Sequence, residues 1–188
     1  MRSIPILPGK YIPGFMVDAR FPKESIKEID RAIENGINLI GELVPYHYSW
    51  KYADSGFEEI LSYADGKNLI FNLHTAEELD VMEELAKKHP TISFVFAHPG
   101  EAPRLKRHIE AMTRCENVYL DLSGTGLFRY GMLKKLVTEI GADRILFGSD
   151  YPVCNAGMYV GGVFFEEITD AERERIFSLN AKKLLGLK

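Results

Sequence analysis

The stretch Ile92-Ser93-Phe94-Val95-Phe96-Ala97-His98-Pro99-Gly100 decides the fold class of this chain. Its first part is mostly apolar, and it runs directly into a polar turn that contains a histidine. A strand that is apolar on both faces is typical of a parallel sheet, because helices cover both sides of such a sheet. Five other runs share this length and character: residues 11–17, 38–44, 68–74, 117–122 and 144–148.

Amphipathic, charged stretches separate these apolar runs, at residues 24–34, 75–88, 103–113, 131–140 and 170–185. In the first of them, Ile26, Ile29 and Ile33 lie on one stripe of a helix. Thr75 and Asp170 are placed to cap the N-termini of the second and the last. Strand and helix thus alternate about six times, which predicts right-handed βαβ units and a parallel sheet. Two architectures remain open at this point, a doubly wound open sheet and a (β/α) barrel.

The composition is typical of an ordinary globular domain, and we expect residues 1–188 to form a single domain. The formal net charge is -4, which argues against a nucleic-acid-binding surface. No apolar run approaches the roughly 20 residues that span a bilayer, and prolines interrupt the N-terminus where a signal peptide would need an apolar run. Cys115 and Cys154 are too few for a disulfide framework, so a reducing, cytoplasmic location is expected.

The informative polar residues lie where the apolar runs end. Glu42 lies in the run 38–44, His74 and His98 end the next two runs, and Asp150 follows the last one. The C-terminal ends of parallel strands meet at one edge of the sheet in both candidate folds, and ligands bind there. Imidazole nitrogens and carboxylate oxygens are ligands of Zn²⁺ and similar ions, which acidify a bound water that a carboxylate can deprotonate. A metal or acid–base site is therefore predicted, although a single histidine at a strand end is commonly structural.

The remaining histidines and an aromatic loop complete the candidate residues. We expect His89 at a solvated helix end and His108 on a helix surface. The loop 45–50, just past Glu42, either packs over the rim of the fold or forms a wall that binds substrate. An arginine in a similar position, after the run 117–122, could hold an anionic substrate. The residues predicted to contact a small-molecule substrate are Tyr46, His47, Trp50 and Arg129.

The motifs at these strand ends resemble the amidohydrolase superfamily and, within it, amidohydrolase family 2. The segments that carry the resemblance are Ile40-Gly41-Glu42, His74-Thr75, His98-Pro99-Gly100 and Phe147-Gly148-Ser149-Asp150-Tyr151-Pro152. The C-terminal segment 180–187 is similar to the helix that closes the barrel in that family. The resemblance implies a (β/α)₈ barrel and a metal-dependent hydrolase, or in some members a nonoxidative decarboxylase or hydratase.

The resemblance also implies roles for individual residues. By position, Glu42, His74 and His98 match strands four, five and six of the barrel, and Asp150 matches strand eight. In two-metal relatives the first three surround one metal, and the residue like Asp150 touches the other or accepts a proton. In one-metal relatives the residues like His74 and Asp150 are ligands, and the one like His98 assists catalysis.

One feature of the family is missing from this sequence. The family's first strand ends in H-x-H, a motif that does not occur here, and residues 14–15 resemble the family's third strand. We therefore expect an incomplete TIM-barrel-like (β/α) fold of about six units, corresponding to strands three to eight. An incomplete barrel leaves open strand edges, which predicts a homodimer that buries them.

These features together predict a metal-dependent hydrolase of a small amide, ester or lactone. The divalent ion, expected to be zinc, would be held by Glu42, His74, His98 and Asp150, with Asp150 and His98 acting in catalysis. Two alternatives remain open: a nonoxidative decarboxylase or lyase on the same scaffold, and a non-catalytic binding protein that keeps the family's outline. The expected partners are a small-molecule substrate and a second copy of the chain, and neither nucleic acid nor a membrane.

Overall fold

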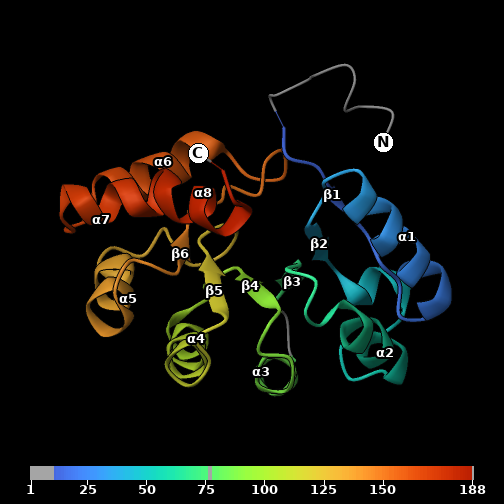
Figure 1. Cartoon of the computed structure of the whole chain (residues 1–188). Coiled ribbons are helices and arrows are strands. Elements are labelled where there is room, and N and C mark those ends of the chain that lie inside the picture. Colours follow the sequence, from blue (N-terminus) through green and yellow to red (C-terminus); the bar gives the residue numbers. More distant parts are fainter. Residues whose placement is uncertain (1–10, 76–77, 188) are drawn as a thin grey trace.

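The fold was analysed in a computed structural model, which describes residues 11–75 and 78–187 (Figure 1). Six strands form one sheet whose spatial order follows the chain: β1 (Gly14–Phe15), β2 (Leu39–Leu43), β3 (Ile70–His74), β4 (Ser93–Ala97), β5 (Val118–Asp121) and β6 (Ile145–Leu146). Every neighbouring pair is parallel. The apolar runs of the sequence thus form the strands, because a parallel sheet buries both faces of each strand.

Helices connect the strands, and further helices follow β6. They are α1 (Pro22–Glu34), α2 (Ser55–Ala64), α3 (Leu79–Lys88), α4 (Ala102–Arg114), α5 (Met132–Ile140), α6 (Ala156–Phe164), α7 (Asp170–Glu174) and α8 (Asn180–Leu185). A 3₁₀ turn, η2 (Pro45–Tyr48), follows β2, and a π-helical turn, η3 (Arg175–Leu179), joins α7 to α8.

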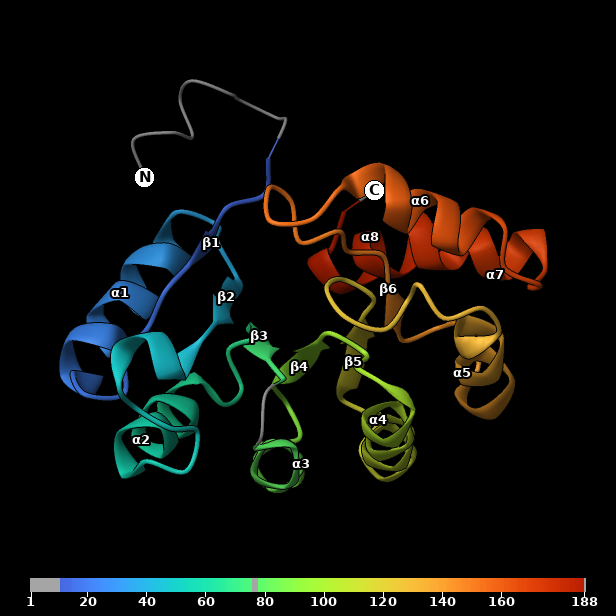
Figure 2. The same cartoon turned by 180° about the vertical axis from the view of Figure 1, so that it is seen from behind.

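The sheet is curved, and the connecting helices line its convex side (Figures 1 and 2). This arrangement is a partial TIM barrel and not a doubly wound sheet, since α2, α3 and α4 all lie on the same side. Among the described residues, β1 and β6 each pair with only one strand and lie at opposite ends of the sheet. The expectation of an incomplete (β/α) barrel is confirmed.

Two apolar clusters hold the layers together. The larger one packs the convex face of the sheet against the helices, and in it Phe71 of β3 contacts both Phe57 of α2 and Phe94 of β4. The smaller one lies on the concave face, where Ile70, Val95 and Leu146 meet side chains of α8. The C-terminal helix therefore covers part of the barrel interior and leaves the C-terminal ends of the strands for polar groups.

The structure differs from the sequence prediction at several element boundaries. The strands predicted at 11–17 and 144–148 shorten to β1 and β6, and the predicted helix 75–88 begins as α3 at Leu79, with residues 76–77 outside the described part. Helices α2 and α6 were not predicted. Thr169, and not Asp170, caps α7, because Thr169 and Glu172 form a reciprocal capping box.

Two histidines were placed wrongly by the sequence analysis, since both are buried. His89 ends α3 and lies between the carboxylates of Glu58 and Asp65, at 3.1 and 3.4 Å. His108 has no exposed surface, and its Nε2 bonds to the carbonyl of His98 at 3.2 Å. A polar side chain can be buried when it finds a hydrogen-bond partner, which the local sequence does not reveal. In the described part of the chain, no helix combines the length and the apolar character needed to cross a membrane.

Candidate metal centre

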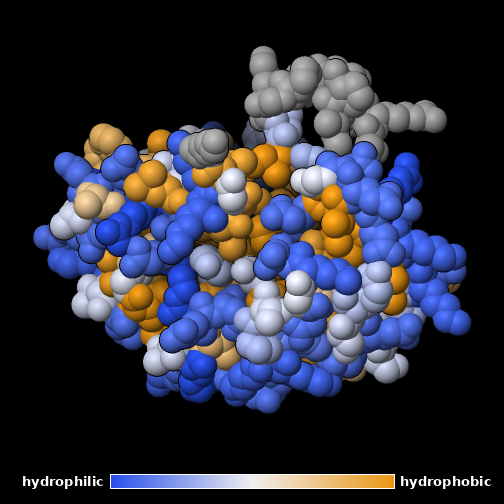
Figure 3. All heavy atoms as spheres, in the orientation of Figure 1, coloured by the Kyte–Doolittle hydropathy of each residue, from blue (hydrophilic) through white to orange (hydrophobic). Residues whose placement is uncertain are grey.

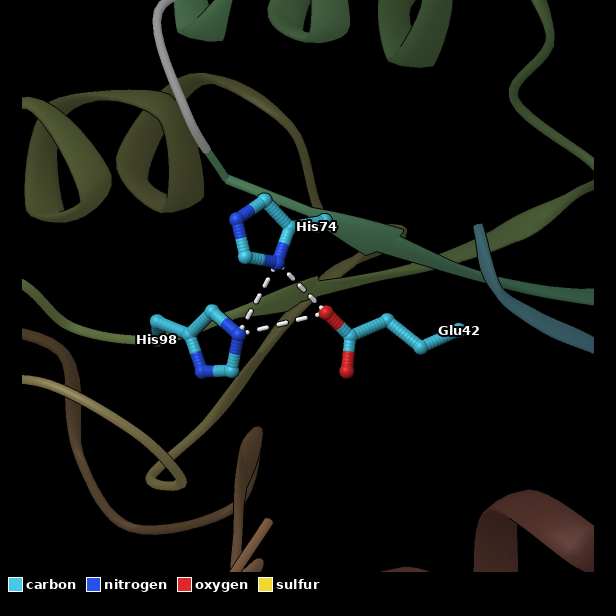
Figure 4. Close-up of side chains that lie close together, drawn as sticks. All are labelled: Glu42, His74 and His98. Carbon is cyan, nitrogen blue, oxygen red and sulfur yellow. Dashed lines mark hydrogen bonds and ion pairs between the residues drawn. The ribbon is translucent and has the colours of Figure 1, made fainter. Parts of the chain in front are cut away.

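Three predicted residues converge at the C-terminal edge of the sheet (Figure 4). His74 Nδ1 lies 2.7 Å from Glu42 Oε1, and His98 Nε2 lies 3.2 Å from the same oxygen. The two ring nitrogens, His98 Nε2 and His74 Nδ1, are 3.0 Å apart. The three side chains come from β2, β3 and the end of β4, so the parallel sheet brings together groups that are far apart in the sequence.

Local backbone features aim these side chains at one another. The pairing of β2 with β3 shifts its register between Ile40 and Leu43, and this irregularity carries Glu42. His74, the last residue of β3, pairs with Ala97, the last residue of β4. His98 follows Ala97 and therefore lies just past the C-terminal ends of both strands. His98 has a φ of 70°, in the left-handed region that non-glycine residues adopt rarely. Such backbone positions are concentrated at functional sites.

The pKa shifts in this cluster favour the charged forms of Glu42 and His98. Burial alone would raise the pKa of Glu42, but hydrogen bonds and charge attraction from His74 and His98 lower it to about 2. Burial lowers the pKa of His98, but the hydrogen bond and charge of Glu42 outweigh it, so the net pKa lies above its usual value. The cluster thus keeps Glu42 as an anion that attracts a cation.

The donor set fits a divalent metal ion. Two imidazole nitrogens and one carboxylate oxygen lie within 4.8 Å of one another, and these are ligand types that zinc and other first-row ions accept. The three donor atoms lie within 3.2 Å of one another, so one cation among them could be bound by all three. Catalytic sites of this kind use few protein ligands and leave positions for substrate or water.

Asp150, the fourth predicted ligand, is outside this group of donor atoms. It follows β6, is partly buried and has a φ of 56°. Its Oδ2 accepts a hydrogen bond from Cys154 Sγ at 3.8 Å, and its carbonyl accepts one from the Cys154 N–H at 3.0 Å. The structure therefore brings together three of the four predicted ligands and places Asp150 on the neighbouring loop.

A pocket of about 820 Å³ opens beside His74. The loop after β2 supplies most of its wall, including Tyr46 and Trp50, and the Tyr46 hydroxyl lies 3.4 Å from His74 Nε2. His47 packs against the Tyr46 ring and is not part of the pocket wall. Arg129 is exposed, pairs with Glu101 at 2.9 Å and does not line the pocket either. Two of the four predicted substrate-binding residues, Tyr46 and Trp50, therefore line the same pocket as His74.

The sequence analysis missed two residues that support the centre, Asp121 and Ser123. Asp121 ends β5, and Ser123 Oγ lies 3.1 Å from His98 Nδ1. Burial raises the pKa of Asp121 above its usual value, and hydrogen bonding from Ser123 offsets only part of that rise. The sequence contained a signal for Asp121, because this polar residue lies at the end of an apolar run, as His74 and His98 do.

Curated proteins with related sequences are decarboxylases. A family model for amidohydrolases matches residues 1–187. Gamma-resorcylate decarboxylases from Polaromonas sp. and Rhizobium sp. are 40% and 28% identical to this chain over 124 residues. Each match covers 55% of this chain and 37% of the relative, so the chain aligns with little more than a third of the length of these relatives.

Solved structures share the fold at low sequence identity. A TIM-barrel protein from Bordetella bronchiseptica matches with a TM-score of 0.84 and 20% identity, covering 98% of this chain and 70% of that one. A 2,6-dihydroxybenzoate decarboxylase complexed with 2,6-dihydroxybenzoate has a TM-score of 0.73 and 18% identity, covering 99% and 74%. A Polaromonas dihydroxybenzoic acid decarboxylase with bound manganese and 2-nitroresorcinol has a TM-score of 0.65 and 18% identity, covering 98% and 72%.

These comparisons correct one expectation and confirm another. The prediction of a hydrolase is wrong, because the curated relatives are nonoxidative decarboxylases, the reaction that the sequence analysis held as an alternative. The strand-end motifs indicated the family and did not separate the two activities. The resemblance itself is confirmed over nearly the whole sequence. This chain, with its partial TIM barrel, belongs to amidohydrolase family 2, a family of enzymes.

Proposed function

We propose that this protein is a metal-dependent nonoxidative decarboxylase of a small hydroxylated aromatic acid. One observation carries the proposal: Glu42, His74 and His98 form a compact donor cluster in a chain that is 40% identical over 124 residues to a gamma-resorcylate decarboxylase. The donor cluster supports binding of the substrate through a metal ion, and the decarboxylase relative supports decarboxylation as the reaction.

Glu42, His74 and His98 would hold the ion. A divalent cation bound there supplies positive charge for the carboxylate and a neighbouring hydroxyl of the substrate. Manganese is present in the Polaromonas structure, and the donor set suits zinc as well. Zinc stays a prediction, and both ions enter the test below.

Asp150 would move the proton that replaces the departing carboxyl group on the ring. Its position on the loop after β6, apart from the donor cluster, supports a proton-transfer role more than a role as a ligand. The pocket beside His74 would take the aromatic ring, since Tyr46 and Trp50 offer apolar faces there. For His47 and Arg129, contact with substrate stays a prediction.

We also propose that the protein forms a homodimer and that it is located in the cytoplasm. The unpaired sides of β1 and β6 support self-association, and Figure 3 shows hydrophobic surface between α6 and β1. Exposed apolar residues on or next to these elements include Met16, which follows β1, Val153, in the segment before α6, and Met158 of α6. Both cysteines are unpaired, which supports a reducing compartment. Light scattering at micromolar concentration tests the dimer, and a stable monomer would refute it.

The reaction is tested with 2,6-dihydroxybenzoate as the probe. Metal-free protein is loaded with Mn²⁺ or Zn²⁺, and release of carbon dioxide and of resorcinol is followed. We expect both products in equal amounts, and their loss in Glu42→Gln. Loaded protein that binds the acid without releasing carbon dioxide from it, or from related hydroxybenzoates, would refute decarboxylation.

A further inference from the structure

We propose that two copies of this chain associate through the outer side of α6. The surface, called the α6 face below, is the exposed side of the segment 151–165, and its large apolar side chains are Tyr151, Val153, Met158, Val160, Phe164 and Phe165. The inference rests on the homodimer of the proposed function and deepens it, because it names the surface that the second copy covers. It depends neither on the metal nor on the reaction.

Helix α6 is apolar on both its inner and its outer side. The segment 151–165 contains no Asp, Glu, Lys, Arg or His. On the inner side, Tyr159 and Val163 are buried in the main apolar cluster, and Gly162 lies against Leu127. A surface helix normally carries polar side chains on its outer side, whereas a helix that is apolar all round is a buried one. Figures 1 and 2 show α6 at the upper margin of the molecule, with no described element above it.

The outer side of α6 presents a stripe on which two helices can approach closely. Gly157, Val160, Gly161 and Phe164 follow the three- and four-residue spacing that places side chains on one side of a helix. A Cβ on Gly161 would meet no atom within 4 Å, so the space beside this residue is open. Glycines four positions apart let two helix backbones come close together. Two identical stripes that cross at a twofold axis offer the same surface to each other.

The exposed area of the α6 face is close to what a stable dimer needs. Val153 and Phe165 are 82% and 80% exposed, and the other four side chains are also largely open. Taking about 200 Å² for a whole aromatic side chain, the six apolar residues expose on the order of 700 Å². A standard interface buries about 800 Å² on each partner. The α6 face could therefore supply most of one side of a dimer interface.

At the β6 end of the sheet, a second copy meets side chains and not a free strand edge. The carbonyls on either side of Ile145 accept bonds from β5, so its own carbonyl points outward. This carbonyl accepts a bond from the Asn180 amide at 2.8 Å, and the Phe147 N–H donates to the Ile176 carbonyl at 2.9 Å. Because the chain itself pairs these groups, they are not available for an added strand.

The charges near the α6 face favour a second copy over a lipid surface. A helix that lies on a membrane carries Lys and Arg beside its apolar side. The charged residues that flank the segment in sequence include Asp150 before it and Glu167 after it, which anionic headgroups repel. Arg173 contacts the Phe164 ring and is paired with Asp170 at 2.6 Å. A second copy needs no charge on this surface, since apolar surface associates with apolar surface.

Sedimentation velocity of the full-length protein, from submicromolar to high micromolar concentration, tests the inference. Val160→Lys places a charge in the middle of the α6 face, and Gly161→Gln fills the open space beside the helix. Each should weaken dimerisation about 30-fold or more, as changes at the centre of an interface do. Circular dichroism should show wild-type helix content for Gly161→Gln, because Gln forms helix more readily than Gly and its side chain meets open space.

Ile33→Lys is the matched control for Val160→Lys. Ile33 is an apolar residue of α1 that is 41% exposed, against 44% for Val160. Helix α1 lies at the β1 end of the sheet, away from α6 (Figure 1). This variant should dimerise like the wild type. All proteins are measured without metal or substrate, so a failure of the proposed reaction would not change the result.

Three results would overturn the inference. Val160→Lys and Gly161→Gln could dimerise as tightly as the wild type, in which case the homodimer stands and its interface lies elsewhere. Ile33→Lys could dissociate as much as Val160→Lys, so that an added charge at any exposed site would explain the loss. The wild type could be a monomer at every concentration, which would refute the homodimer of the proposed function as well. Flotation of such a monomer with phosphatidylcholine vesicles would assign the α6 face to a lipid surface.

Discussion

His108 should make the stability of this protein fall at mildly acidic pH. Its side chain is fully buried beside Phe96, where Nε2 bonds to the His98 carbonyl and Nδ1 has no partner in the described part of the chain. A protonated ring would carry a second N–H in a place without an acceptor. Burial accordingly lowers the pKa of His108 to about 3.

The size of the effect follows from proton linkage. In the unfolded chain His108 takes up a proton below about pH 6.5, whereas the folded protein excludes it until about pH 3. Stability is therefore unaffected above pH 6.5 and declines as the pH falls from there toward 3. Between pH 7 and pH 5 the loss from this residue is about 2 kcal/mol.

Urea unfolding of the metal-free protein with a chelator present measures this loss. The wild type and His108→Gln are compared at pH 8.5, 7 and 5. The difference in unfolding free energy between them should be the same at pH 8.5 and 7, which is the internal control. At pH 5 it should shift by about 2 kcal/mol in favour of the variant. An equal difference at all three pH values would refute the argument that burial keeps His108 neutral.

Three further predictions concern the site and the ion pairs. Asp150→Asn should bind Mn²⁺ like the wild type in calorimetry but turn over on the order of 100-fold more slowly, and unchanged turnover would remove Asp150 from proton transfer. Glu42→Gln should weaken Mn²⁺ binding by more than the about 10–100-fold expected for residues behind the ligands, and a smaller loss would contradict its role as a ligand. Glu83→Gln should lower the unfolding free energy by about 2 kcal/mol, since Glu83 is buried and receives two bonds from Arg114 at 2.6 and 2.8 Å. Glu84→Gln is its exposed control and should change the unfolding free energy by less than about 0.5 kcal/mol in the same urea titration.

The sequence alone predicted the fold class and three residues of the candidate site. The runs around Leu73, Phe96 and Leu120 are apolar on both faces, and this pattern is stable only in a sheet covered by helices. Once the strands are parallel and consecutive, their C-terminal ends must share one edge. The positions of Glu42 and His98 near the same point follow from that topology.

The sequence could not assign the reaction. The resemblance implied hydrolases and decarboxylases alike, so the motif around Asp150 indicated the family and not the chemistry. Similarity to curated relatives over 124 residues separated the two activities, because it extends along a much longer stretch of the chain than the strand-end motifs.

Only the tertiary structure decided which polar residues are buried and which of them cooperate. His108 and His89 look like surface residues in sequence, since charged neighbours surround them, but carbonyl and carboxylate partners from distant segments let the core accept them. Asp121 and Ser123 lie 23 and 25 positions from His98 in the chain but contact it in the fold, and Asp150 is not part of the donor cluster. Such relations depend on side-chain direction and on the space that Gly124 and Gly148 leave open, and a pattern of residue types along one chain does not contain them.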